Sequence, residues 1–162
     1  MDVSLPAAFT INAVGPGDFE DWVELALELW PEEDEEDRQD LRHTLAVILD
    51  ADHKTGWIAR DAAGAAIAFM NLSLRQDYVP GATQSPVAYL EGIYVRSPYR
   101  HQMVGRALVR RAEQWARQQG CMELASDALI ENQGSYQFHR KVGFEEVERV
   151  VCFIKPLNEH NQ

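Results

Sequence analysis

Basic residues gather between Leu90 and Trp115, in a chain whose formal net charge is −11. No acidic residue lies between Glu91 and Glu113, and the stretch reads as an apolar strand, a short loop and an amphipathic helix. Backbone N–H groups and the helix dipole converge at such a helix N-terminus, so that it attracts anions. We therefore predict an anion site in a loop made of Arg100, His101, Gln102, Met103, Val104, Gly105 and Arg106. The alternative is a helix whose exposed face is simply rich in arginine.

A glycine inside the preceding strand pattern, Gly92, points to a second feature of this region. Glycine weakens a strand and often marks a β-bulge or a close approach of a ligand to the backbone. A bulge would leave backbone N–H and C=O groups free to pair with an extended, amide-containing ligand arm, and pantetheine ending in a pyrophosphate is such a ligand. Two common phosphate motifs, Gly-x-Gly-x-x-Gly and the Gly-Lys-Ser/Thr ending of a P-loop, are absent from the sequence.

Hydrophobic periodicity indicates the elements that position these residues. It predicts a helix from Phe19 to Trp30, ended by Pro31, and a second helix that begins within the acidic run Glu32–Asp37. The polar segment 75–86 reads as a loop. Further elements are predicted from β-patterns, helical spacing and turn residues: strands over 9–14, 56–60, 65–74, 88–95, 122–126 and 146–154, and helices over 104–119 and 132–142. This order predicts a mixed α/β sheet with helices on its faces.

Composition bounds the class of protein. The 162 residues, 46% hydrophobic and 25% charged, fit one soluble domain over residues 1–162. No apolar run is long enough to cross a membrane, and the N-terminal MDVSLPAAFT lacks the basic start of a signal peptide. Cys121 and Cys152 lack a metal-site spacing, which predicts reduced thiols, no metal and a cytoplasmic protein. The negative charge argues against a nucleic-acid partner and suits a cationic small substrate.

The basic junction resembles the signature loop of the GNAT superfamily of acyl-CoA-dependent N-acetyltransferases, commonly written Gln/Arg-x-x-Gly-x-Gly/Ala. Arg100 and Gly105 match the ends of this loop, whereas Met103 stands where the inner glycine usually is. The later segment from Asn132 to Phe144 is similar to the superfamily's Asn…Tyr-x-x-x-Gly-Phe motif, with His139 at the usual tyrosine position.

Other strings resemble one branch of that superfamily, the aminoglycoside 6′-N-acetyltransferases of type I. They run in order from about residue 18 to 155, and include Leu29-Trp30-Pro31, Arg75-Gln76-Asp77-Tyr78-Val79, Leu90-Glu91-Gly92-Ile93 and Ala125-Ser126-Asp127. The resemblance implies a mixed, mostly antiparallel sheet that is flanked by helices and splayed at a central bulged strand. It also implies a homodimer.

Acetyl-CoA is the acetyl donor that the resemblance implies, lying along the bulged strand with its pyrophosphate at the loop. The backbones of Ile93, Tyr94 and Val95 would contact the pantetheine and the acetyl group. His101 to Arg106 would supply amides to the pyrophosphate, and Asn132 would contact the cofactor beyond the splayed strand. Because a methionine retains its N–H but has less conformational freedom than glycine, we expect cofactor binding to survive at Met103.

For the acceptor, the resemblance implies a site of aromatic and acidic side chains: Trp30, Tyr78, Glu91, Asp127 and Glu148. An aliphatic ammonium must lose a proton before its nitrogen attacks a thioester, and carboxylates can hold it and take that proton. We expect Glu91 to relay the proton and Asp127 to hold the ammonium. His139 is a candidate acid for the departing thiolate. The alternatives are structural: Trp30 and His139 as packed residues, Asp127 as a turn or cap residue.

We therefore predict an acetyl-CoA-dependent N-acetyltransferase that transfers the acetyl group directly to an amine of a cationic small molecule. The favoured acceptor is the 6′-amino group of an aminoglycoside antibiotic, with resistance as the consequence. Two alternatives stay open: an enzyme of the same fold that acts on a polyamine or a protein amine, and a non-catalytic acyl-CoA-binding module.

Overall fold

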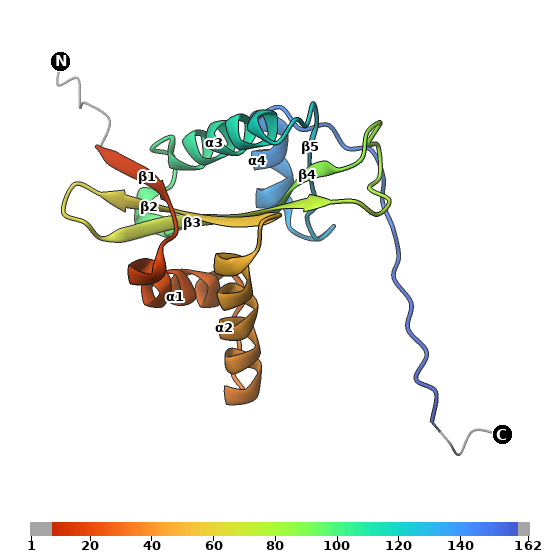
Figure 1. Ribbon diagram of the computed structural model, residues 1–162, viewed down its shortest axis with the longest axis horizontal. Coiled ribbons are helices and arrows are strands. Elements are labelled where there is room, and N and C mark those ends of the chain that lie inside the picture. The colour runs from red at the N-terminus through yellow and green to blue at the C-terminus, as the bar shows by residue number, and fades with distance from the viewer. Residues whose placement is uncertain (1–7, 159–162) are drawn as a thin grey trace. The chain divides into compact units, whose positions relative to one another are not determined.

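The computed structural model describes residues 8–158, and its sheet orders the strands β1-β2-β3-β4-β5 (Figure 1). Antiparallel pairing joins the first four of these strands in sequence. β5 pairs parallel with β4. The bounds are Phe9–Ala13 for β1, Lys54–Asp61 for β2, Ala66–Arg75 for β3, Val87–Val95 for β4 and Leu124–Ser126 for β5. The prediction of a mixed, mostly antiparallel sheet is confirmed.

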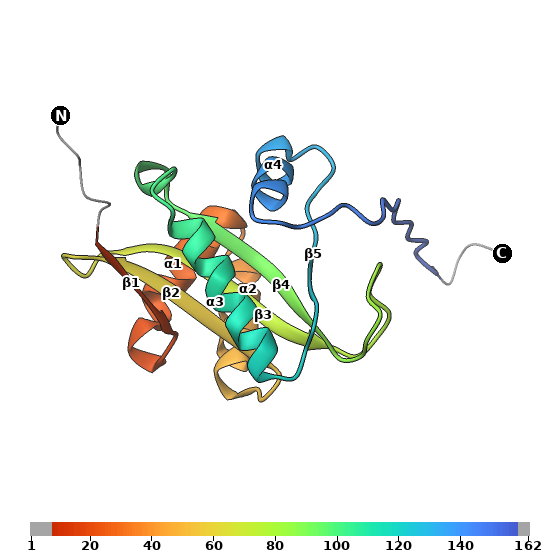
Figure 2. The ribbon, with the colours of Figure 1, turned by 90° about the horizontal axis from the view of Figure 1, so that it is seen from above.

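Three helices cover the two faces of the sheet. α1 (Phe19–Leu29) and α2 (Glu35–Asp50) lie on one face, and α3 (Val104–Gln118) lies on the other (Figures 1 and 2). Single 3-10 turns precede α1 at Pro16–Asp18 and follow β4 at Ser97–Tyr99. α2 begins within the acidic run as predicted, since the Asp34 side chain accepts a hydrogen bond from the Glu36 N–H at 2.8 Å and caps the helix.

The core between the sheet and α1 follows from the helical spacing of apolar residues. Trp22, Leu25 and Ala26 of α1 are fully buried and pack with Leu45 of α2 and Phe69 of β3. The opposite core is formed by the apolar stripe of α3: Val104, Leu108, Val109, Ala112, Trp115 and Ala116. Both faces of the long central strands are thereby removed from water, which fixes their register.

The chain forms two compact units, Met1–Asp127 and Ala128–Gln162. The first contains the sheet and the helices α1 to α3, and the second contains α4 (Gln133–Lys141). One domain over 1–162 stays a prediction. The N-terminal residues up to Ala7, on which the absence of a signal peptide was partly argued, lie outside the described residues. Within residues 8–158, no helix is both long and apolar enough to cross a membrane.

The strand predicted over residues 146–154 is wrong for the described part of the chain. Residues 145–158 have no strand pairing, and the apolar side chains among them are exposed: Val147, Val150, Val151, Phe153, Ile154 and Leu157. β-Branched and aromatic residues favour a strand only where a neighbouring edge and a packed face are available. The sequence pattern of this segment is therefore compatible with a strand, but the segment does not pair with the five-stranded sheet.

Candidate active site

A β-bulge in β4 brings the sequence-predicted carboxylate Glu91 onto the face of the sheet covered by α1 and α2. In the β3–β4 ladder, Leu72 lies opposite Leu90 and Asn71 lies opposite Gly92. Glu91 is therefore the extra residue of β4, without a partner of its own. The bulge indicated by the mid-strand glycine is confirmed.

The missing side chain of Gly92 makes room for a tryptophan. A Cβ atom added at Gly92 would lie 2.5 Å from Cη2 and 2.6 Å from Cζ2 of Trp30, at the C-terminal end of α1. The Trp30 ring also packs edge-on against Phe69, with the ring centroids 5.8 Å apart. Trp30 as a whole is half-buried, and its ring lies directly against the bulge.

The Glu91 carboxylate is held by two residues of β3. Its Oε1 accepts hydrogen bonds from Ser73 Oγ at 2.6 Å and from Arg75 Nε at 2.8 Å. Its Oε2 accepts a third from Arg75 Nη2 at 2.6 Å. Partial burial would raise the pKa of Glu91, but the hydrogen bonds and charge of Arg75, with Ser73, outweigh it and hold that pKa below its ordinary value.

The second predicted carboxylate, Asp127, follows the last residue of β5 and is joined to β4 by a tyrosine. Tyr89 donates its phenolic hydrogen to Asp127 Oδ2. Burial, and then this bond, raise the pKa of Tyr89, so the phenol stays protonated and donates. The Arg75 guanidinium lies over the Tyr89 ring, with its Cζ atom 3.4 Å from the ring centroid. Glu91 and Asp127 therefore belong to one connected array.

A cavity of about 660 Å³ opens beside this array. It lies at the start of β2 and the end of β3, and mixed charges line it: His53, Lys54, Ser73, Leu74, Arg75, Gln76, Asp77, Tyr78 and Glu91. The predicted aromatic Tyr78 is 83% exposed at the rim, where its ring is available to a ligand. The cavity is thus large enough for part of a small polar molecule and carries Glu91 in its wall.

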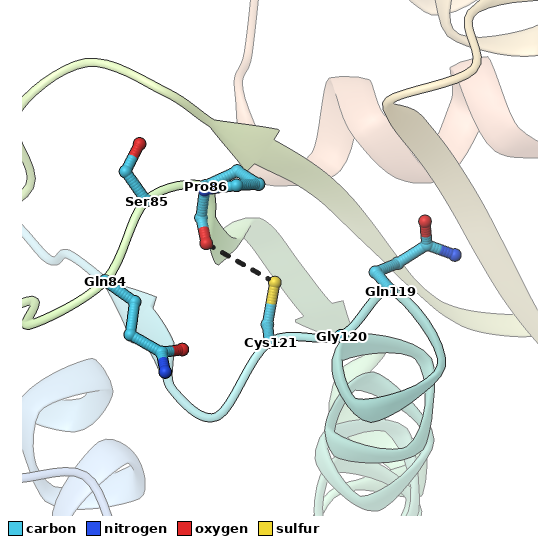
Figure 3. A pocket seen from close by; sticks show the side chains of 6 residues that line it. All are labelled: Gln84, Ser85, Pro86, Gln119, Gly120 and Cys121. Carbon is cyan, nitrogen blue, oxygen red and sulfur yellow. Dashed lines mark hydrogen bonds between the residues drawn. The ribbon is translucent and has the colours of Figure 1, made fainter.

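A smaller hollow of about 330 Å³ lies where the loop before β4 meets the end of α3 (Figure 3). Its six lining residues are Gln84, Ser85, Pro86, Gln119, Gly120 and Cys121. The Cys121 thiol points to the Pro86 carbonyl oxygen at 3.6 Å. The lining has no charged side chain, and the thiol is buried, so this hollow lacks the groups that acid–base chemistry on an amine requires.

On the donor side, the outer edge of β4 loses its neighbour at the bulge. The last pair between β4 and β5 is Leu90 with Ser126, so Ile93, Tyr94 and Val95 have ladder partners only on β3. Their half-buried backbone lies next to a strand edge that β5 does not cover. An extended, amide-containing ligand fits such an edge, because its own N–H and C=O groups can replace those of a strand.

The predicted anion loop leads from β4 into α3, as expected. Met103 is the N-cap residue of α3, and it adopts the left-handed conformation with φ 68°. His101 does the same with φ 62°. Since α3 begins at Val104, the N–H groups of Val104 and Gly105 have no carbonyl four residues earlier in the helix to bond. Met103 thus has the left-handed backbone conformation that glycine favours, and a pyrophosphate at the first-turn amides of α3 stays a prediction.

Two side chains of this loop, those of Arg100 and Gln102, donate hydrogen bonds to backbone carbonyl groups of the protein. Arg100 Nε donates to the Val95 carbonyl oxygen at 2.9 Å, and its guanidinium lies 5.6 Å from the Tyr94 ring centroid. The Gln102 side-chain amide donates to the Pro98 carbonyl oxygen at 3.1 Å. Arg100 therefore braces the end of β4 against the loop.

Three predicted residues, Asn132, His139 and Glu148, lie in the second compact unit. Asn132 caps α4 by accepting a hydrogen bond from the Ser135 N–H at 3.0 Å. His139 Nδ1 lies 2.7 Å from the Ser135 carbonyl oxygen. Because a carbonyl only accepts, Nδ1 carries the proton, and a neutral His139 presents its Nε2 as an acceptor. Glu148 is exposed in the segment that forms no strand.

Sequence reasoning missed the residues that connect the two carboxylates, Arg75, Tyr89 and Ser73. Ser73 and Arg75 alternate along β3, and Tyr89 precedes Glu91 by two residues on β4. Alternate polar residues on an apolar strand share one face, and this was the available signal. Among residues 8–158, no group of three or more His, Cys, Asp or Glu side chains could hold a metal ion.

Comparison of the sequence with known protein families and proteins points to the acetyltransferase (GNAT) family. The model of the Acetyltransferase (GNAT) family matches residues 19–144. A curated aminoglycoside N(6′)-acetyltransferase type 1 from Serratia marcescens is 44% identical over 136 residues, which cover 84% of this chain and 91% of the relative.

Solved structures agree with the sequence comparison. The aminoglycoside 6′-N-acetyltransferase AAC(6′)-Ih from Acinetobacter baumannii has a TM-score of 0.83 at 36% identity, covering 93% of this chain and 100% of that one. AAC(6′)-Iy, solved with the bisubstrate analogue CoA-S-monomethyl-acetylneamine, has a TM-score of 0.84 at 36% identity with the same two coverages.

Proposed function

Because the chain belongs to the acetyltransferase (GNAT) family, we propose that it transfers the acetyl group of acetyl-CoA to the 6′-amino group of an aminoglycoside. The observation that carries this proposal is the connected array beside the β4 bulge. Its two carboxylates, Glu91 and Asp127, lie beside the point where the β4 edge toward β5 becomes unpaired, which supports an acceptor site next to a donor site. The named relatives act on this class of acceptor.

The residues present fit a CoA thioester. The edge of β4 at Ile93 to Val95 would pair with the pantetheine amides, and the first turn of α3 would bind the pyrophosphate. Bound there, the thioester would supply the activated acetyl group. A backbone N–H at the bulge would polarise the thioester carbonyl, because charge grows on that oxygen during attack.

The acceptor ammonium would be held beside the bulge. Glu91 and Asp127 would supply negative charge, and the Trp30 ring beside Gly92 would supply an aromatic wall that favours a nearby cation. A carboxylate or an ordered water then takes the proton, and the free amine attacks. His139 stays our candidate acid for the departing thiolate, a role in which its Nε2 would first take up a proton and then donate it.

An acceptor panel tests the proposal. Release of the CoA thiol is followed with aminoglycosides that carry or lack the 6′-amino group, with polyamines and with a peptide amine. We expect turnover of the 6′-amino compounds and at least about a hundredfold lower kcat/KM for matched 6′-hydroxy analogues. Turnover of polyamines alone would show that the acceptor is a polyamine and not an aminoglycoside. Binding of CoA without thiol release in the presence of any amine would show that the protein is only an acyl-CoA-binding module.

We also propose a cytoplasmic homodimer that confers resistance in the cell. Two free thiols, Cys121 and Cys152, suit a reducing compartment. Six apolar side chains between Val147 and Leu157 are exposed, and contact with a second copy would remove them from water. Sedimentation of the full chain, before and after Phe153→Asp, measures the association. The minimum inhibitory concentration of a 6′-amino aminoglycoside measures the resistance.

A further inference from the structure

Arg75 contacts two members of the array, Glu91 and Tyr89. Its guanidinium forms two hydrogen bonds to the Glu91 carboxylate, at 2.8 and 2.6 Å, and lies 3.4 Å from the centroid of the Tyr89 ring. Tyr89 in turn donates to Asp127. The planar guanidinium is suited to this double task, because its edge binds a carboxylate bidentately while its face stacks on an aromatic ring.

We propose that Arg75 is a positioning residue of the acceptor site, which fixes the orientation of the Glu91 carboxylate and joins it, across Tyr89, to Asp127. This proposal rests on the proposed function, since it assigns the two carboxylates to one acceptor ammonium. It also reassigns a role. A carboxylate that accepts three hydrogen bonds is a weak base, so Glu91 binds the ammonium, and a proton relay through Glu91 is not favoured.

The charges around Glu91 come from several elements. Lys54, at the start of β2, and His53 before it line the same cavity. Arg75 and the following Asp77 and Tyr78 approach from the end of β3. Tyr89 and Asp127 lie on the other side of Arg75. Without Arg75, the half-buried Glu91 would keep Ser73 as its hydrogen-bond donor and Lys54 as a nearby charge. Its carboxylate would then be less stabilised and free to rotate.

Arg42, on α2, offers a matched control. Its guanidinium forms two hydrogen bonds to Glu20, at 3.0 and 2.7 Å, and lies 5.3 Å from the Phe19 ring centroid. It thus makes the same two kinds of contact as Arg75, but on residues that do not line the cavity. Arg42→Gln therefore reports what the loss of such a pair does to the fold alone.

The experiment compares Arg75→Gln, Arg75→Lys and Arg42→Gln in the full chain. For Arg75→Gln we expect the acceptor KM to rise at least about tenfold, kcat to change less than about threefold and the Kd of CoA to stay constant. Arg75→Lys should restore part of the loss, since it keeps the charge but not the bidentate geometry. Arg42→Gln should leave the acceptor KM unchanged.

A second readout needs no turnover. The carboxyl carbon of Glu91, followed by ¹³C NMR against pH, should titrate at a higher pH in Arg75→Gln than in the native protein, and at an intermediate pH in Arg75→Lys. An unchanged titration of Glu91 would overturn the proposal, as would equal kinetic losses in Arg75→Gln and Arg42→Gln. If the native protein acetylates no aminoglycoside, the proposed function fails, whereas the Glu91 titration still decides the role of Arg75.

Discussion

Replacement of Gly92 by alanine tests the packing of Trp30 against β4 beside the proposed acceptor site. The added Cβ would lie 2.5 and 2.6 Å from two atoms of the Trp30 ring and 3.4 Å from Leu29 Cδ2. Carbon atoms in contact lie about 3.5–4.0 Å apart, so the ring must move by about 1 Å. The ring is the element that moves, because β4 is bonded to β3 along this stretch.

The magnitude follows from overpacking. Insertion of one methyl group into a packed contact costs about 1–3 kcal/mol. For a chain of this size each kcal/mol lowers Tm by about 2–4 °C, so we expect a fall of about 2–12 °C. A displacement of about 1 Å in a residue that positions a substrate can cost about a hundredfold in rate. We therefore expect the acceptor kcat/KM of Gly92→Ala to fall at least about tenfold, with the Kd of CoA less affected.

Gly56→Ala is the matched control for this substitution. Its Cβ would lie 2.5 Å from Cζ2 of Trp22, a fully buried ring whose Nε1 donates to Asn71 Oδ1 at 3.0 Å. Both variants overpack a tryptophan from α1 against the sheet, but Trp22 lies in the core. Thermal unfolding and acceptor kinetics are measured on both. Tm should fall in both, and the acceptor kcat/KM should fall mainly in Gly92→Ala.

Two results would refute this reasoning. Equal kinetic losses in Gly56→Ala and Gly92→Ala would mean that general destabilisation causes them. The second result concerns the double variant Gly92→Ala with Trp30→Ala. If Gly92→Ala lowers the unfolding free energy as much in the Trp30→Ala background as in the native protein, the new methyl group does not contact the Trp30 ring.

Three further predictions follow. Met103→Gly should keep or raise the free energy of unfolding by up to about 1 kcal/mol, because glycine tolerates φ 68°, whereas the β-branched Met103→Val should lower it by about 1–2 kcal/mol in urea unfolding. The pKa of Glu91 is lowered from 4.5 in the folded protein, so its ionised pair with Arg75 stabilises the fold above pH 4.5. This stabilisation is lost as the pH falls from 4.5 through the lowered pKa. The difference in unfolding free energy between the native protein and Glu91→Gln should therefore shrink over that range. With a net charge of −11, the kcat/KM of a multiply charged acceptor should fall as salt is raised, and an unchanged value would count against electrostatic attraction.

The elements were largely predictable because local patterns determine them. The helical spacing around Trp22 and the acidic start of α2 gave those helices within a few residues. A lone glycine among apolar residues indicated the bulge at Glu91, since few other positions in a strand favour glycine. The loop before α3 was likewise found from its arginines and from its place between a strand and a helix.

The connections between side chains were not predictable in the same way. Arg75 was assigned to a loop, whereas β3 continues through Arg75 and pairs it with Val87. This error of one residue concealed that Arg75 and Ser73 share a face with Tyr89. The strand over 146–154 failed for the related reason that pairing depends on a neighbouring edge, which a sequence pattern does not contain.

The bulge explains why donor and acceptor chemistry meet at one point of β4. Before it, at Leu90, the strand is paired on both edges, and after it the edge toward β5 is open. The extra residue also keeps Glu91 and Gly92 on the acceptor face, the first in contact with Arg75 and the second beneath Trp30. A regular strand would turn one of these two residues to the face covered by α3. The bulge therefore sets both the unpaired edge that we propose for the donor and the side chains that we propose face the acceptor.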